Sequence, residues 1–349
     1  MMRDDYTSQP PRARAAKQQQ PRQAGQPKPP KRTRSALRVF LFLTLGLLLL
    51  AAVYLGYLVK QGNDALKQIG TDEVVPAEDS VKNKPVAMLM MGMDTRPVKG
   101  GTMNTDVMMV AAFNPDRQTA TVVTIPRDSL MMLDGYKQRK ANSYYSAFYR
   151  QARQDMEQAA AEAEAKEAMQ RMMTKYFGIP VSYTGIIDFT GFSAVVNALG
   201  GVKVNVDMDM HYEDSADDTV IDLEKGEQVL DGDQALDFVR YRKSNDGSNM
   251  SNDFERNQRQ SEVLGAITDK MKSLSGVAKA GAVIGAVGDN MKINMPSSEI
   301  QHMITKYFGI DRANITFIPL AGEWNSPYVY LDTGKLEEAR ASLQAQMAQ

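Results

Sequence analysis

Residues 39–59 form an unbroken run of uncharged side chains, most of them Leu, Val and Ala. A helix of twenty-one such residues is long enough to cross the roughly 30 Å hydrocarbon layer of a bilayer. The run therefore predicts a transmembrane helix that divides the chain into parts on opposite sides of a membrane. A cleaved signal peptide needs a shorter apolar region and a small-residue cleavage site, which residues 56–60 do not convincingly supply, so we expect a retained anchor.

The segment before this run is basic, rich in Pro and Gln, and nearly free of apolar side chains. It cannot bury a core, which predicts a disordered tail over residues 1–38. Arg32, Arg34 and Arg38 precede the run and few charges follow it, so the positive-inside rule places the tail in the cytoplasm and the later residues outside. The basic tail is also compatible with nucleic-acid binding, but it carries no helix-turn-helix pattern, and we expect no nucleic-acid partner.

The remaining residues predict a polar stalk over 60–84 and one domain over 85–349, because no second Pro-, Gly- or Ser-rich linker divides them. Short apolar runs at 86–92, 106–113 and 119–125 indicate buried strands at the centre of a sheet, and a tight turn at 114–118 indicates an antiparallel hairpin. Further strands are expected at 183–188, 202–206 and 314–319. The predicted fold class is α/β, a central mixed sheet flanked by helices.

Helices are predicted between these strands. Residues 141–176 are rich in Ala, Glu, Gln and Met without an interior Gly or Pro, which predicts one long helix closed by Gly178. A short helix is expected at 192–199. Asp231 and Gln234 have the spacing of a capping box for a helix over 234–240, and Asn252 or Asp253 is expected to cap another that runs to residue 271.

The chain has no Cys and two His. This excludes disulfides, thiol nucleophiles and thiolate metal sites, and leaves almost no material for a Ser-His-Asp triad or a zinc site made of several His. Carboxylates, arginines and a hard metal ion remain. Asp94 ends the first predicted strand and Asp106 begins the second, so the two carboxylates are candidate ligands for Mg²⁺ or Mn²⁺, although each alone also suits a turn or cap.

Two groups of charged residues are candidates for a phosphate site. After the third strand, Pro126 precedes Arg127 and Asp128, which alone are equally typical of a surface ion pair. Later the chain gathers arginines within one short stretch, where each guanidinium offers a rigid fork of donors that matches phosphate oxygens. A solvated helix end is the alternative interpretation of that stretch. Its members are Arg240, Arg242, Arg256 and Arg259.

In order along the chain, seven motifs resemble the LytR-CpsA-Psr family over about residues 85–270. They are Gly-Met-Asp-Thr-Arg at 92–96, Asn-Thr-Asp at 104–106, Ile-Pro-Arg-Asp at 125–128, Lys-Ala-Asn at 140–142, Ala-Leu-Gly-Gly-Val at 198–202, the segment 226–242, and Asp-Phe-Glu-Arg-Asn-Gln-Arg-Gln at 253–260. Each motif is weak alone, but seven in order behind one predicted membrane span are specific.

The resemblance implies a membrane-anchored phosphotransferase of the Gram-positive cell envelope. It would move a teichoic acid, capsule or related glycopolymer from a polyprenyl pyrophosphate carrier onto peptidoglycan, forming a phosphodiester. By resemblance, Asp94 and Asp106 hold Mg²⁺. The residues expected to bind the pyrophosphate or act in catalysis are Arg96, Arg127, Asp128, Arg240, Arg242, Asp253, Arg256 and Gln260, with Asp253 or a metal-linked Asp as the general base.

Three departures from the family pattern stand out. Met103 and Asn104 replace a common Gly-Arg, the loop 243–252 is longer than in many relatives, and Glu255 stands where Gly is usual. Two other functions fit parts of the sequence: a non-catalytic binder or scaffold for lipid-linked glycans, and a transcriptional attenuator. The presence of both Asp94 and Asp106 favours the enzyme, because a binder needs only the arginines and an apolar pocket.

Overall fold

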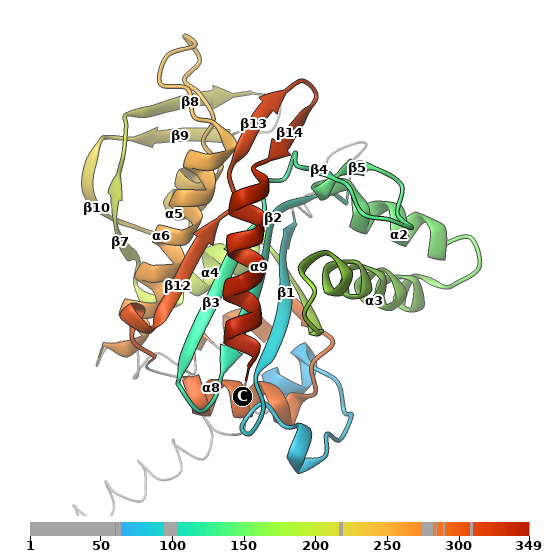
Figure 1. Ribbon diagram of the computed structural model, residues 1–349. Coiled ribbons are helices and arrows are strands. Elements are labelled where there is room, and N and C mark those ends of the chain that lie inside the picture. The colour runs from blue at the N-terminus through green and yellow to red at the C-terminus, as the bar shows by residue number, and fades with distance from the viewer. Residues whose placement is uncertain are drawn as a thin grey trace, which may run out of the picture. The chain divides into compact units, whose positions relative to one another are not determined.

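A six-stranded mixed sheet forms the centre of the computed structural model, which describes residues 60, 64–93, 103–215, 219–273, 282–283, 285–288, 290–307 and 310–348. Its strand order is β11-β6-β1-β2-β3-β12, with β1, β2 and β3 antiparallel to one another (Figure 1). β6 runs parallel to β1 and β12 runs parallel to β3. The predicted fold class and central strands are confirmed. The strands are β1 (Val86–Met93), β2 (Thr105–Asn114), β3 (Thr119–Thr124), β6 (Val181–Asp188), β11 (Met291–Ile293) and β12 (Ile315–Pro319).

Alternating side chains of β1 supply cores on both faces of this sheet. Leu89 and Met91 are fully buried in the core beneath the helices α2 (Tyr144–Ala152), α3 (Gln158–Phe177) and α9 (Thr333–Met347). Val86 and Met88 enter a second core on the other face, which includes residues of α8 (Ser297–Tyr307). Burial on both faces explains why the strand sequences are continuous apolar runs rather than alternating ones.

The predicted hairpin between β2 and β3 is confirmed. The side chain of Asn114 accepts hydrogen bonds from the backbone N–H groups of Asp116 and Arg117, both at 3.1 Å, which organises the turn. Gln118 closes the turn with a φ of 50°, in the left-handed region. The turn thereby fixes the register between β2, which begins at Thr105 next to Asp106, and β3, which ends shortly before Arg127.

The prediction of one helix over 141–176 is wrong. A 3-10 turn, η2 (Ala141–Ser143), leads into α2, and residues 153–157 separate α2 from α3. The chain reverses direction between α2 and α3, and the two helices pack against each other (Figure 1). They do so because both carry apolar faces that are buried in the same core. Tyr144 and Met169 lie in that core. Tertiary packing thus overrides a local composition that favours a continuous helix.

A second group of elements packs around its own hydrophobic core beside the sheet. Asp231 and Gln234 form the predicted capping box and Asn252 caps the following helix, so both of these predictions are confirmed. The predicted strand at 202–206 exists, but it pairs with β10 in a separate sheet. The elements are α4 (Phe189–Leu199), β7 (Val202–Val206), β8 (Met210–Asp214), β9 (Thr219–Leu223), β10 (Gly226–Leu230), α5 (Gly232–Arg240) and α6 (Asp253–Lys272).

Packed structure begins earlier than the predicted boundary at residue 85. Leu66 and Ile69 are buried, and the buried carboxylate of Glu299 on α8 accepts hydrogen bonds from Ser80 Oγ at 3.0 Å and from Val81 N at 2.7 Å. Residues 64–84 therefore lie against the domain instead of forming a polar stalk. The remaining short elements are η1 (Ala77–Asp79), β4 (Leu130–Met131), β5 (Arg139–Lys140), η3 (Arg312–Asn314), β13 (Gly322–Asn325) and β14 (Tyr328–Leu331).

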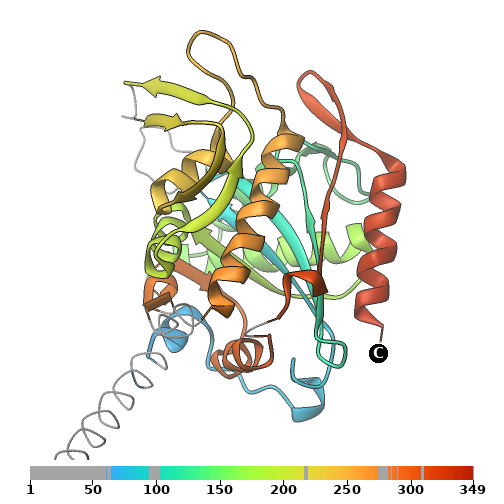
Figure 2. The same cartoon turned by 90° about the vertical axis from the view of Figure 1, so that its left-hand side faces the viewer.

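Figure 2 shows α6 and β12 side by side, so the second group of elements meets the sheet along this helix. The predicted tail over 1–38 and membrane span over 39–59 lie outside the described residues. Among the helices that the structure does describe, none has the length and apolar character needed to span a bilayer.

Candidate active site

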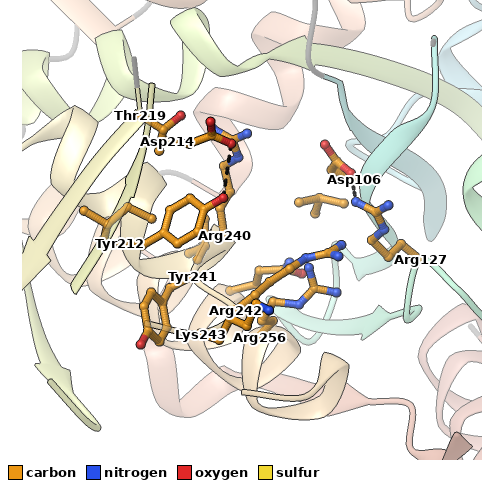
Figure 3. Close-up of a pocket in the computed structure, with 14 residues that line it drawn as sticks. Asp106, Arg127, Tyr212, Asp214, Thr219, Arg240, Tyr241, Arg242, Lys243 and Arg256 are labelled. Carbon is orange, nitrogen blue, oxygen red and sulfur yellow. Dashed lines mark hydrogen bonds and ion pairs between the residues drawn. The ribbon is translucent and has the colours of Figure 1, made fainter. Parts of the chain in front are cut away.

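A pocket of about 360 Å³ lies where the start of β2, the end of β3, the hairpin β8–β9, the end of α5 and the first turns of α6 meet (Figure 3). Six of the residues predicted from sequence line it together: Asp106, Arg127, Arg240, Arg242, Arg256 and Gln260. The rest of the lining is Val107, Tyr212, Asp214, Thr219, Ile221, Val239, Tyr241 and Lys243. Residues more than 150 positions apart in the chain thus share one site.

One wall of the pocket carries Arg127, whose guanidinium forms an ion pair with Asp106. The backbone C=O of Arg127 accepts a hydrogen bond from Asn142 N at 3.0 Å, which ties its segment to η2. Asp128 does not line the pocket. It is 8% exposed, and its carboxylate lies 2.9 Å from Lys140 Nζ and 3.7 Å from Arg127 Nε. Asp128 therefore acts on the pocket through Arg127, as the buried anion behind that guanidinium.

The floor of the pocket comes from the end of α5 and the start of α6. Tyr241 is 1% exposed and its hydroxyl is 2.8 Å from Ser244 Oγ, so the buried ring anchors the backbone between Arg240 and Arg242. Arg240 stacks over the Phe189 ring at 4.6 Å. Figure 3 shows the guanidinium groups of Arg242 and Arg256 directed toward Arg127.

These three guanidinium groups perturb one another. Burial, reinforced by the positive charge of Arg127, lowers the pKa of Arg242. Burial, followed by the charges of Arg242 and Arg127, lowers the pKa of Arg256 to about 9, so its side chain still carries a positive charge at neutral pH. Three neighbouring cations, of which Arg127 and Arg256 are partly removed from water, can bind an anion with more than one charge, such as a pyrophosphate. A solvated helix end does not account for the burial of Arg256.

Arg259 belongs to a different environment although it is three residues from Arg256. It is 2% exposed and binds both carboxylate oxygens of Asp207, with Nε–Oδ1 and Nη2–Oδ2 distances of 2.7 Å. Its Nη1 also donates to Ser251 Oγ at 3.1 Å. Arg259 is therefore a structural residue that joins α6 to the end of β7, and it is absent from the pocket lining.

The wall opposite Arg127 was not predicted from the sequence. It consists of Tyr212, Asp214 and Thr219 on the hairpin β8–β9, and Tyr212 Oη donates a hydrogen bond to Asp214 Oδ2 at 3.2 Å. Residues 210–213 alternate between apolar and polar side chains, and residues 219–221 are all β-branched, which were the available signals for this hairpin. Each strand is only five residues long, which makes these signals easy to miss.

Three other predicted site residues are only partly addressed by the structure. Asp94 and Arg96 lie outside the described residues, and Asp253 begins α6 without a described side chain. Met93, which precedes Asp94 in sequence, pairs with Thr105, which precedes Asp106. In the described ranges no three His, Asp or Glu side chains come together as a metal site. One pocket carboxylate, with phosphate oxygens as further ligands, nevertheless fits Mg²⁺, which commonly binds one or two carboxylates and retains waters.

The fold and the pocket define a class: an α/β domain with a pocket rich in arginine. The model of the LytR_cpsA_psr family matches residues 53–345. The chain therefore belongs to this family, as its motifs predicted.

Two relatives come from Bacillus subtilis (strain 168). The polyisoprenyl-teichoic acid–peptidoglycan teichoic acid transferase TagT is 30% identical over 296 residues, which cover 81% of this chain and 81% of TagT. The corresponding transferase TagV is 30% identical over 274 residues, covering 76% of this chain. The match spans 65% of the length of TagV.

Solved structures support the fold. The crystal structure of B. subtilis TagV superposes with a TM-score of 0.57 and 28% identity, over 76% of this chain and 97% of that one. The structure of TagT bound to LI-WTA superposes with a TM-score of 0.54 and 26% identity, over 79% and 99% of the two chains.

Proposed function

We propose that the protein transfers a teichoic acid or a related anionic glycopolymer from a polyprenyl pyrophosphate carrier to peptidoglycan, forming a phosphodiester. The convergence of Arg127, Arg242 and Arg256 in one pocket is the observation that carries this proposal. Phosphoryl transfer needs positioning and charge neutralisation more than covalent chemistry, and these side chains supply both. The names of TagT and TagV support the choice of donor and acceptor.

In the proposed reaction the residues of the pocket have distinct roles. Arg127, Arg242 and Arg256 bind the pyrophosphate, and Gln260, one turn along α6 from Arg256, offers an uncharged amide to the same group. Asp128 and Lys140 hold Arg127 in place. The predicted span over 39–59 would keep the domain at the outer face of the membrane, where a polyprenyl-linked donor is held.

The transfer reaction itself is the first test. Purified protein, incubated with a polyprenyl pyrophosphate-linked glycopolymer and peptidoglycan oligomers, should yield a covalent product whose link is cleaved as a phosphodiester. Mass spectrometry of the digested product measures this. Donor binding without any product would instead indicate the non-catalytic binder, and neither binding nor product would reject the proposal.

A divalent cation is the second element of the proposal. Asp106, together with Asp94, would hold Mg²⁺ or Mn²⁺, and the bound ion would neutralise charge on the phosphate oxygens. Chelation should therefore lower the transfer rate at least about tenfold, and added Mg²⁺ should restore it. Asp106→Asn should raise the Mg²⁺ concentration needed for half-maximal rate. Full activity in excess chelator would remove the metal from the proposal while leaving the transferase intact.

A further inference from the structure

The protein's single tryptophan lies on the surface, at the end of the sheet that carries the pocket. Trp324 belongs to β13 and is 57% exposed. β12 runs parallel to β3, and its last residue, Pro319, pairs with Thr124, the last residue of β3. The two strands therefore bring the segments that follow them to the same end of the sheet: β3 leads to Arg127, and β12 leads to the hairpin β13–β14. An exposed indole at this end is available to a ligand of the site.

The hairpin β13–β14 is fixed to the segment that carries Arg127, because Val329 N donates to Asp128 O at 2.9 Å and the Val329 side chain is 2% exposed. Trp324 pairs with Val329 across the hairpin, so both side chains lie on the face that is turned toward this segment. On this face Lys140 Nζ lies 5.7 Å from the centroid of the Trp324 ring. The same ammonium group binds the carboxylate of Asp128, which in turn holds Arg127. The indole therefore has a defined position beside the wall of the pocket.

The hairpin β13–β14 lies at the end of the domain away from residues 64–84. Figure 1 and Figure 2 both show these two segments at opposite ends. The predicted span over 39–59 would bring the bilayer to the end that carries residues 64–84. The exposed indole is then far from the lipid headgroups, where tryptophan is otherwise common, and close to the cell wall.

The charge of the hairpin distinguishes between the two substrates of the proposed reaction. Residues 322–331 contain one charged side chain, Glu323, and no Lys or Arg. Lys140, the cation beside the indole, already binds Asp128. An anionic glycopolymer would therefore meet a like charge here. The glycan strand of peptidoglycan consists of N-acetylated amino sugars without phosphate groups, and the apolar faces of such rings can stack on an indole.

We propose that Trp324 is an acceptor subsite: its indole stacks on a sugar ring of the peptidoglycan strand and holds that strand beside the pocket. This inference rests on the proposed function, in which peptidoglycan is the acceptor. A strand held at Trp324 passes the wall of Arg127, so a hydroxyl further along the strand reaches the pyrophosphate. The subsite binds the acceptor equally before and during transfer, and it therefore affects acceptor affinity and not the chemical step.

Trp324 reports its own occupancy, because the chain has no other tryptophan. When full-length protein is titrated with soluble peptidoglycan oligomers, the tryptophan emission should change and saturate, since stacking removes water from the indole. Vesicles of phosphatidylglycerol with brominated acyl chains should not quench the emission. No response to peptidoglycan, a larger response to the lipid-linked donor, or quenching by brominated lipid would each overturn the inference.

In the transfer assay, Trp324→Ala should raise KM for the peptidoglycan acceptor at least about tenfold, a usual effect of truncating an interface tryptophan. The value of kcat at saturating acceptor and the affinity for the donor should be unchanged, because only uniform binding of the acceptor is lost. Trp324→Phe keeps a smaller ring and should recover part of the acceptor affinity. A merely structural role of the indole would instead lower kcat or the thermal stability.

Tyr330→Ala is the matched control. Tyr330 is 41% exposed on β14 and pairs with Glu323, so its side chain lies on the face of the hairpin opposite Trp324. Its replacement should leave KM, kcat and the emission response unchanged. If Trp324→Ala transfers with the wild-type KM, the inference is wrong and the proposed function stands. If wild-type protein forms no product, the proposed function fails, and the emission titration still decides whether Trp324 binds peptidoglycan.

Discussion

Replacing Arg256 with alanine should reduce glycopolymer transfer at least about a hundredfold, because the guanidinium neutralises charge on the pyrophosphate in a partly water-excluded site. The protein should remain folded. Burial and two neighbouring arginines lower the pKa of Arg256 from its ordinary value of 12.5 to about 9, so its charge is less favourable in the folded than in the unfolded protein. Removing that charge therefore costs little stability. The measurement is kcat and donor affinity, with thermal unfolding of the same sample.

Arg171→Ala provides a matched control. Arg171 is an exposed arginine on α3, with 56% of its side chain accessible, and it pairs with Glu164 at the surface. Its replacement should leave both transfer and donor binding unchanged. A variant lacking Arg256 that transfers at the wild-type rate would show that the arginine pocket is not the donor site.

Replacing Arg259 with alanine should have the opposite pattern and cost about 1.5–3 kcal/mol of unfolding free energy, because a buried side chain loses its hydrogen bonds to a charged group. The substitution leaves Asp207 without its bidentate partner and removes the donors to Tyr241 O and Ser251 Oγ. Chemical denaturation measures the loss, and any decrease in transfer should follow the fraction of unfolded protein. Material that remains folded should bind donor with wild-type affinity.

A double-mutant cycle with Asp207 checks the cause of this loss. If the Arg259–Asp207 pair is responsible, Arg259→Ala combined with Asp207→Ala should cost less than the sum of the two single substitutions. The exposed Arg171→Ala should change the unfolding free energy by less than about 0.5 kcal/mol. An additive cycle would mean that Arg259 stabilises α6 through its other contacts.

Much of the fold follows from local patterns. The apolar runs of β1, β2 and β3, the turn at Asn114 and the capping box at Asp231 each depend on neighbouring residues alone, and all are present. The break between α2 and α3 could not be predicted in this way, because no Gly or Pro marks it. It arises because two helical faces must bury their apolar side chains in one core, which is a property of the assembled protein.

The motifs along the chain were sufficient to place it in its family. They also identified Asp106 and four arginines that line the pocket, because charged residues in this order at the ends of strands and helices are rarely needed for folding alone. Only the tertiary structure decided what each charge does. Arg256 and Arg259 lie three positions apart on one helix, yet the first faces other arginines across a pocket and the second pairs with the carboxylate of Asp207. Asp214 carries no motif of its own and joins the site only through the hairpin β8–β9. The residues that surround each of these charges are distant from it in sequence. Sequence spacing therefore does not give the electrostatic environment of a charge, which depends on distances in space.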